Sequence, residues 1–192
     1  MAMTQERYVG REVLRKEDPE FLTGRARYTD DLVLPGMLWM AVVRSPFAHA
    51  RIKKVDVSRA VAMEGVVAAF SGQDLAGDWA APLLMAWPVT EDIKNPPHWP
   101  LARDKARYQG DGVAVVVAES RALAADAVEA VDVEYEPLPA VVDMEAALAE
   151  GAPVVHEEFG TNRCYTWTHT NGDVERVFAE APVVVKERYA IQ

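Results

Sequence analysis

The stretch GDGVAVVVAESRALAADAVEAVDVEYEPLPA, residues 110–140, decides the fold because two elements of different period follow each other in it. Its first part, Val113–Ala118, is wholly apolar and rich in β-branched side chains, and a glycine opens it. A short run of this kind is typical of a strand that is buried on both faces. We therefore predict an interior strand here.

A helix is predicted directly after this strand. Ser120 stands where its hydroxyl can accept a hydrogen bond from a free amide of the first helical turn. Charged side chains lie on the other faces of the same segment, and apolar side chains recur at helical spacing: Leu123, Ala124, Ala127, Val128 and Val131. The pattern indicates an amphipathic helix that packs on a sheet.

A second strand follows, in which Val131, Val133 and Tyr135 alternate with three acidic residues until Pro137 ends the pattern. About a dozen residues separate the two strands, which is near the minimum for a parallel crossover. The prediction is a βαβ unit at residues 112–136 with parallel strands, in an α+β domain.

Composition excludes several classes of protein. The chain has 192 residues and a formal net charge of −10, and its basic residues are scattered, which argues against a nucleic-acid surface. Apolar runs are far too short to cross a membrane, and residues 1–20 lack the apolar segment of a signal peptide. We expect a cytoplasmic protein. Its single cysteine, Cys164, allows no internal disulfide and cannot hold an iron–sulfur cluster alone.

The rest of the chain predicts further short elements around this unit. Strands are expected at Met37–Val43, His49–Val57 with a bulge at Lys53–Lys54, Gly65–Phe70 and Cys164–Thr170. Val183–Ile191 is expected to form an edge strand or a disordered tail. Short helices are expected at Ser58–Met63 with Ser58 as cap, at Val141–Leu148 with Asp143 as cap, and after Gly172 with Asp173 as cap.

Residues 76–100 differ in character, since they carry five prolines together with Trp79, Trp87 and Trp99. Proline at this density excludes regular structure. Two interpretations stay open. The tryptophans contact another chain, as exposed aromatic residues often do, or their rings fold back over the sheet.

No catalytic constellation stands out. His49 could act as a base, but an isolated histidine at the start of a strand is more often structural. Cys164 could be a nucleophile beside Arg163, yet no base accompanies it. Asp30–Asp31 are expected to be turn and capping carboxylates rather than half a metal site, Glu157–Glu158 to lie in a solvated loop, and Gly110–Gly112 to form a turn rather than a phosphate loop. The four histidines lack the spacing of a zinc site.

An ordered series of local motifs resembles the start of the large, molybdopterin-binding subunit of the molybdenum hydroxylases, the family of xanthine dehydrogenase, aldehyde oxidase and carbon monoxide dehydrogenase. The likeness spans nearly the whole chain from about residue 9 and is most similar to the carbon monoxide dehydrogenase type. It rests on GRARYTDD at 24–31, LPGML at 34–38, VRSPFAHARI at 43–52, AMEGV at 62–66, GVAVVVA at 112–118, AADA at 124–127, VEYEPLPA at 133–140 and NGDV at 171–174.

This resemblance implies an α/β-hammerhead fold, a bent mixed sheet on which the βαβ unit at residues 112–136 and short helices pack. The implied division is an N-terminal arm at 1–20, a hammerhead domain at 21–142, and at 143–192 a linker with the truncated start of the molybdopterin-binding domain. Family motifs for the cofactor and the catalytic base lie further along the larger chains. No residue here matches them, so no catalytic, cofactor-binding or metal-binding residue is expected in this stretch.

The function that the resemblance implies is that of a scaffold and subunit-docking part, inactive alone. In the full assembly the large chain would carry molybdenum with molybdopterin cytosine dinucleotide, and an iron–sulfur subunit and an FAD subunit would accompany it in a dimer of heterotrimers. The assembly would hydroxylate an aldehyde, a heteroaromatic compound or carbon monoxide. The residues themselves leave an alternative open, a self-contained interaction or assembly module without enzymatic activity.

Overall fold

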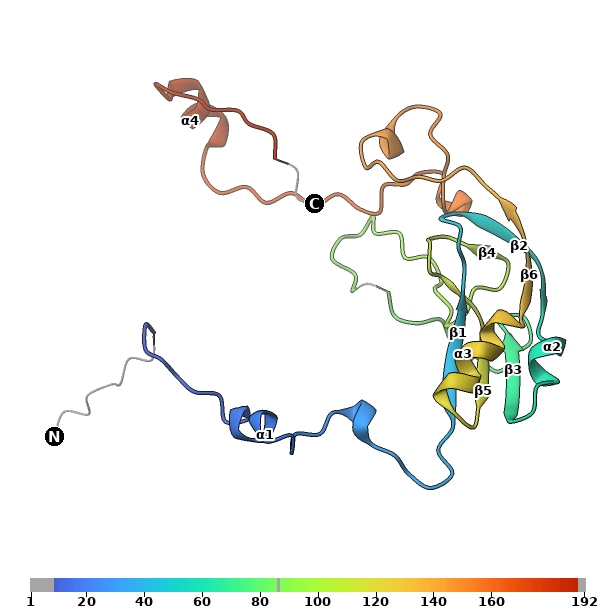
Figure 1. Ribbon diagram of the computed structural model, residues 1–192. Helices are drawn as coiled ribbons and strands as arrows, with labels where there is room; N and C mark the ends of the chain where they lie inside the picture. Colours follow the sequence, from blue (N-terminus) through green and yellow to red (C-terminus); the bar gives the residue numbers. More distant parts are fainter. Residues whose placement is uncertain (1–8, 86, 190–192) are drawn as a thin grey trace.

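The computed structural model describes residues 9–85 and 87–189, which form two small antiparallel sheets (Figure 1). In the first sheet the central strand β5 lies between β1 and β3; in the second, β2 lies between β4 and β6. The strands are β1 (Trp39–Arg44), β2 (Ala50–Asp56), β3 (Val66–Ser71), β4 (Lys105–Ala106), β5 (Gly112–Ala118) and β6 (Asp132–Pro137).

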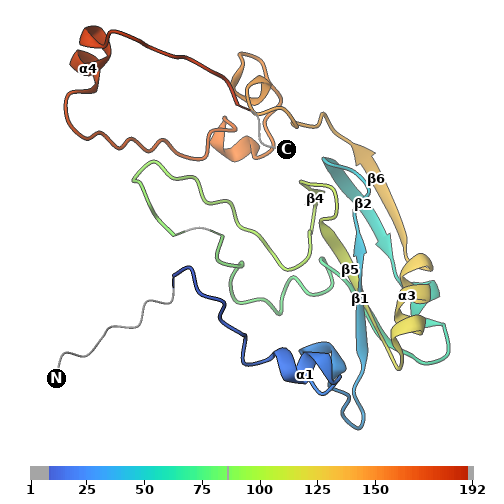
Figure 2. The ribbon, with the colours of Figure 1, turned by 60° about the vertical axis from the view of Figure 1, so that its left-hand side comes forward.

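The helical elements are short. Four are α-helices, namely α1 (Asp18–Leu22), α2 (Ser58–Val61), α3 (Arg121–Glu129) and α4 (Val174–Glu180), and three are 3₁₀ turns, η1 (Thr29–Asp31), η2 (Ala146–Leu148) and η3 (Glu157–Phe159). In Figure 2 helix α3 lies beside β5 and β1, whereas α4 stands away from the sheets. The packed part of the described chain is therefore built from the strands, α2 and α3.

The strand, helix and strand predicted at residues 112–136 are confirmed, but their predicted parallel pairing is wrong, and neither sheet is mixed. Strand β5 pairs antiparallel with β1 and β3, while β6 pairs antiparallel with β2 in the other sheet. The length of a crossover permits parallel pairing but does not select the partner. Both edges of β5 are occupied, and the charged, half-exposed β6 suits the edge of a second sheet.

Helix α3 fills the space on the inner side of the first sheet. The Ser120 hydroxyl accepts a hydrogen bond from the amide of Leu123 at 3.2 Å, which confirms the predicted cap. Ala124 and Ala127 are buried, and Ala127 packs with Ala69 and Val116 in one apolar cluster. These small side chains let the helix approach the sheet closely.

The bulge predicted in the second strand is confirmed. The register between β2 and β6 shifts between Ile52 and Lys54. Ile52 is buried in the core, and the ammonium of Lys53 reaches the Glu136 carboxylate on β6 at 2.6 Å. The bulge thus separates an apolar inward position from a charged outward one.

Several predicted details differ from the structure. Residues 164–170 contain no strand. Residues 183–189 contain none either, which contradicts the edge-strand alternative for Val183–Ile191, and Ile191 lies outside the described residues. The N-cap position of helix α2 is Val57 and not Ser58, and the Asp56 carboxylate accepts hydrogen bonds from the Ser58 amide and hydroxyl. An alternating pattern favours a strand only where a neighbouring strand satisfies its backbone groups, and these segments have no such neighbour among the described residues.

The cap predicted at Asp173 is confirmed, whereas the helix predicted at Val141–Leu148 is only the 3₁₀ turn η2, whose N-cap position is Glu145 rather than Asp143. The Asp143 carboxylate accepts from the amides of Glu145 and Ala146, and the Asp173 carboxylate accepts from the amide of Arg176 at 3.0 Å. Capping residues act within one turn of the chain, so they can be predicted without knowing the tertiary neighbours.

The chain that follows the long loop packs closely against the first sheet, where Ala102 lies next to Gly72. The Gly72 amide donates to the Val113 carbonyl at 3.1 Å, and the Ala102 amide donates to the Gly112 carbonyl at 2.7 Å. A Cβ atom at Gly72 would stand 2.3 Å from the Ala102 carbonyl oxygen. Only glycine allows the two backbone segments to lie this close.

We expect Gly72→Ala to lower the free energy of unfolding by about 1 to 3 kcal/mol, because the methyl group meets backbone that must shift. Urea unfolding followed by circular dichroism measures this. The matched control is Gly77→Ala, where an added Cβ meets nothing within 4 Å and the φ angle is not positive. Equal stability of the two variants would contradict the close approach at Gly72.

Candidate functional site

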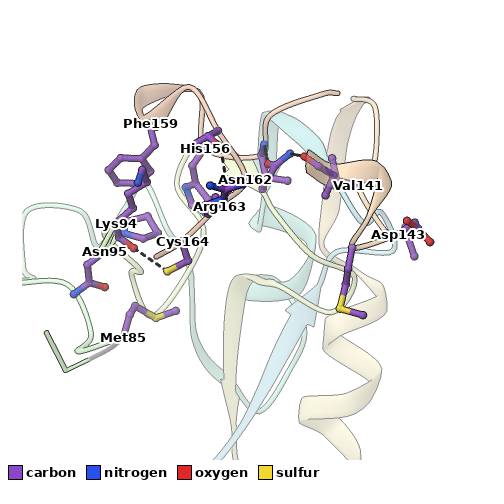
Figure 3. A pocket seen from close by; sticks show the side chains of 16 residues that line it. Met85, Lys94, Asn95, Val141, Asp143, His156, Phe159, Asn162, Arg163 and Cys164 are labelled. Carbon is purple, nitrogen blue, oxygen red and sulfur yellow. Dashed lines mark hydrogen bonds between the residues drawn. The ribbon is translucent and has the colours of Figure 1, made fainter. Parts of the chain in front are cut away.

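A cavity of about 510 Å³ lies between the long loop and the segment after β6 (Figure 3). Met85, Lys94 and Asn95 line one side of it, and Val141 and Asp143 lie on another. Its walls also include His156, Phe159, Asn162, Arg163 and Cys164 from the segment that contains η3. The cavity is thus the place where three stretches without strands meet.

Asn162 holds two of these stretches together. Its side-chain amide donates to the carbonyl oxygens of Ala147 and Pro153 at 3.0 and 2.8 Å, and its side-chain oxygen accepts from the Val155 amide at 3.0 Å. One side chain thereby satisfies three backbone groups that no strand partner satisfies. Asn162 fixes the shape of the cavity wall.

Cys164 joins the third stretch to the same wall. The Lys94 amide donates to the Cys164 carbonyl at 3.0 Å, and the Cys164 thiol donates to the Lys94 carbonyl at 3.3 Å. The thiol is thus used in a backbone contact. No base is hydrogen-bonded to it among the described residues, so the candidate nucleophile lacks the geometry of an activated cysteine.

A buried lysine connects the cavity wall to the second sheet. Lys105 on β4 has a side chain that is only 6 % exposed, and its ammonium donates to both oxygens of the Glu157 carboxylate at 2.7 Å. Glu157 belongs to η3, and this hydrogen bond lowers the pKa of its carboxyl group. Glu157 lies in an exposed loop as predicted, with its side chain 62 % exposed, and it also supplies the counter-ion that the buried cation of Lys105 requires.

His156 lies next to this ion pair on the cavity wall. Burial lowers its pKa, and the neighbouring positive charge of Arg107 lowers it further. Its Nδ1 stands 3.4 Å from a carboxylate oxygen of Glu158. The imidazole therefore carries less positive charge at pH 7 than an exposed histidine would.

His49, the candidate base, is a buried structural residue. Its Nδ1 is 2.9 Å from the Pro139 carbonyl oxygen, and the His49 carbonyl accepts from the Leu138 amide. These contacts bind the start of β2 to the chain that leaves β6. The structural interpretation of this histidine is confirmed.

The acidic pair and the glycine pair also have structural roles. Asp30 forms an ion pair with Arg121 at 2.6 Å, and Asp31 accepts from the Tyr28 amide at 2.9 Å. Gly110 has a φ of 93° and lies in a turn that the Asp111 amide closes by donating to the Tyr108 carbonyl at 3.2 Å. The capping role predicted for Asp31 and the turn predicted at Gly110 are confirmed, whereas the Asp30 carboxylate forms an ion pair instead of a cap. The described residues contain no group of three or more histidine, cysteine or acidic side chains that could hold a metal ion.

The tryptophans of the long loop divide between the two interpretations. The Trp79 and Trp99 rings stack with centroids 6.1 Å apart, and the Arg103 guanidinium lies 3.6 Å from the Trp99 centroid. These two rings fold back onto the domain. Trp87 remains 74 % exposed, with Leu84 and Val89 exposed on the same loop.

Sequence reasoning missed Lys105, Asn162 and Arg103. Arg103, Lys105 and Arg107 occupy every second position. In an extended segment such spacing places three cationic side chains on the same side. That pattern was a signal. Nothing local marks Asn162, because its partners lie up to 15 residues away in sequence.

The Lys105–Glu157 pair predicts a specific pH dependence. Because folding lowers the pKa of Glu157, the pair stabilises the protein fully above the ordinary carboxyl pKa of 4.5, and this contribution is lost as the pH falls through the folded value. Glu157→Gln should therefore lower the melting temperature at pH 7, and the difference from the parent should shrink in acid. Thermal unfolding at several pH values measures it.

Glu150→Gln, a change of the same kind in an exposed loop, is the control for this experiment. Adding Lys105→Met to Glu157→Gln should restore part of the loss, since no buried charge then lacks a partner. A Glu157→Gln effect that does not depend on pH would contradict the assigned role of the pair.

Comparison with known proteins places this geometry in a family. The family model described as "Aldehyde oxidase and xanthine dehydrogenase, a/b hammerhead domain" matches residues 23–139, which are more than half of the chain. The carbon monoxide dehydrogenase large chain of Hydrogenophaga pseudoflava is 40 % identical over 185 residues, in an alignment that covers 90 % of this chain and 22 % of that protein. The xanthine dehydrogenase molybdenum-binding subunit of Escherichia coli O157:H7 is 36 % identical over 168 residues, covering 88 % and 22 %.

A solved structure agrees with these matches. Quinoline 2-oxidoreductase from Pseudomonas putida 86 superposes with a TM-score of 0.80 at 41 % identity, over 94 % of this chain and 23 % of that one. The chain spans less than a quarter of the length of these relatives. It belongs to the aldehyde oxidase and xanthine dehydrogenase family of molybdenum hydroxylases, within which it corresponds to the a/b hammerhead portion of the large subunit.

Proposed function

We propose that this chain is the N-terminal scaffold and subunit-docking part of a molybdenum-cofactor oxidoreductase large subunit. The observation that carries the proposal is the alignment of 90 % of the chain, at 40 % identity, with 22 % of a carbon monoxide dehydrogenase large chain. A self-contained module would not be expected to align, over almost the whole of its own length, with one part of a much larger enzyme.

The proposed activity of the full assembly is oxidative hydroxylation of an aldehyde, a heteroaromatic compound or carbon monoxide. Relatives whose names state carbon monoxide, xanthine or nicotine support this range of small substrates. Residues 1–192 alone are proposed to be inactive. The candidate residues support this, because His49 and Cys164 are engaged with backbone carbonyls.

Molybdenum with molybdopterin cytosine dinucleotide is the proposed cofactor of the full large chain. The described residues do not fit it as a ligand set, since no three potential metal ligands gather among them. Asp143, His156 and Cys164 line one cavity, but His156 is held beside Glu158 and the Cys164 thiol donates to the backbone. The cofactor is therefore assigned to other parts of the large chain.

The domain division proposed for this stretch is an N-terminal arm at 1–20, a hammerhead domain at 21–142, and a linker with the start of the molybdopterin-binding domain at 143–192. Residue contacts support a boundary near 142. Strand β6 is the last strand before it, and beyond it the described chain is held by side chains such as Asn162 and Glu157 rather than by strand pairing.

The exposed part of the long loop is the proposed docking surface for the partner subunits. Leu84 is 75 % exposed, Trp87 74 % and Val89 57 %. Tryptophan is enriched among the residues that dominate binding energy at protein interfaces. The proposed partners are an iron–sulfur subunit and an FAD subunit, in a dimer of heterotrimers located in the cytoplasm. No helix among the described residues is long and apolar enough to span a bilayer.

Trp87→Ala should weaken the association of the full-length large chain with its partner subunits by about tenfold or more, because it removes the largest exposed side chain of this loop. Co-purification and surface plasmon resonance measure it. The control is Trp167→Ala, which removes a similarly exposed tryptophan, 68 % exposed, on another segment. Unchanged binding by the Trp87 variant would contradict docking through this loop.

A further inference from the structure

The first sheet has an inner face that is covered by helices. Val43 on β1, Ala69 on β3 and Val116 on β5 point to this side and are at most 7 % exposed. Helices α2 and α3 both contact the sheet there, and Ala60 and Ala127 from these helices pack with Ala69 and Val116. The helices thus account for the burial of one face.

The opposite face carries two apolar rows that run across all three strands. The strand register places Met40 beside Val117 and Val117 beside Ala68; in the next row it places Val42 beside Val115 and Val115 beside Phe70. We call these six residues the outer patch. None of them is fully buried; Met40 is 65 % exposed and Phe70 39 %.

The outer patch contains no polar or charged side chain in either row. An antiparallel sheet with one face in water normally alternates apolar and polar residues along each strand. Strand β5 does not alternate, because Val115 and Val117 face outward while Ala114 and Val116 face inward. The sequence of β5 is that of a strand buried on both faces, whereas the described residues bury the inner face fully and leave Val115 and Val117 on the outer face only half-buried.

The chemistry of the outer patch is that of a domain core. It consists of valine, alanine, methionine and phenylalanine with no polar side chain, whereas a reversible interface is on average only about 56–58 % non-polar and its hot spots are enriched in Trp, Tyr and Arg. The long loop differs, because Trp87 is exposed there beside aliphatic residues. Two exposed apolar surfaces of the same chain therefore suit two kinds of contact, one permanent and one between subunits.

We infer that the outer patch is covered within the same polypeptide, by a part of the large chain that lies outside residues 1–192. This inference rests on the proposed function. The aligned stretch is only 22 % of the carbon monoxide dehydrogenase large chain, which leaves more than three quarters of that relative to supply a covering element. A contact within one chain is permanent, as the core-like composition requires.

Cysteine accessibility in the full-length large chain tests this inference. Met40→Cys puts a thiol in the most exposed position of the outer patch, and its alkylation rate is followed by mass spectrometry of the peptide that contains residue 40. We expect alkylation at least about 100-fold slower than in denaturant, since it would require local opening. The rate should be equally slow in the large chain alone and in its assembly with partner subunits.

Ala122→Cys, on the exposed side of α3, is the matched control for the chemistry and for folding of the variant. Fast alkylation of Met40→Cys in the isolated large chain, with protection only in the assembly, would assign the patch to a partner subunit and overturn the inference. Protection that depends on protein concentration would assign it to a second copy and overturn it as well.

These outcomes are distinguishable from failure of the proposed function. A native chain without a large downstream part contradicts both proposals at once. A full-length Met40→Cys large chain that contains molybdenum, but whose introduced thiol reacts quickly, contradicts only the inference about the outer patch.

Discussion

The structure depends on the double pairing of strand β5. Its backbone is hydrogen-bonded antiparallel to β1 on one side and to β3 on the other, so one strand fixes two distant parts of the chain. Helix α3 leaves the end of β5 and packs back on the inner face through Ala124 and Ala127. The chain then passes to β6 and the second sheet, which shares the core through Ile52 and Val133.

The segments outside the sheets are held in place by single side chains instead of by hydrogen bonds between paired strands. Asn162, the Lys105–Glu157 pair and the Arg103 guanidinium over Trp99 each fix one irregular segment. Such contacts hold a loop in place but do not build a core. This explains why the cavity and the exposed tryptophan occur here, in the part of the described chain that has the least regular structure and the most surface for other protein segments to contact.

Local rules in the sequence were sufficient for much of the fold. The caps at Ser120 and Asp173 and the bulge near Lys53 depend on neighbours within a few residues, and the structure confirms them. Strand partners depend on the whole chain, so the pairing of β5 with β1 and β3 could not be deduced from the length of the crossover. The same reason applies to the counter-ion of Lys105, which lies 52 residues away. The family resemblance, which the comparisons confirm, came from the order of many motifs rather than from any single one.

The proposed role of this stretch is that of one part of a molybdenum-containing large subunit. Intact mass and molybdenum content of the native gene product test this role most directly. We predict a single polypeptide several times heavier than the 21.2 kDa of this chain, with molybdenum bound in a stoichiometric amount. A native product close to 21.2 kDa and free of molybdenum would contradict it, and would favour a self-contained assembly module.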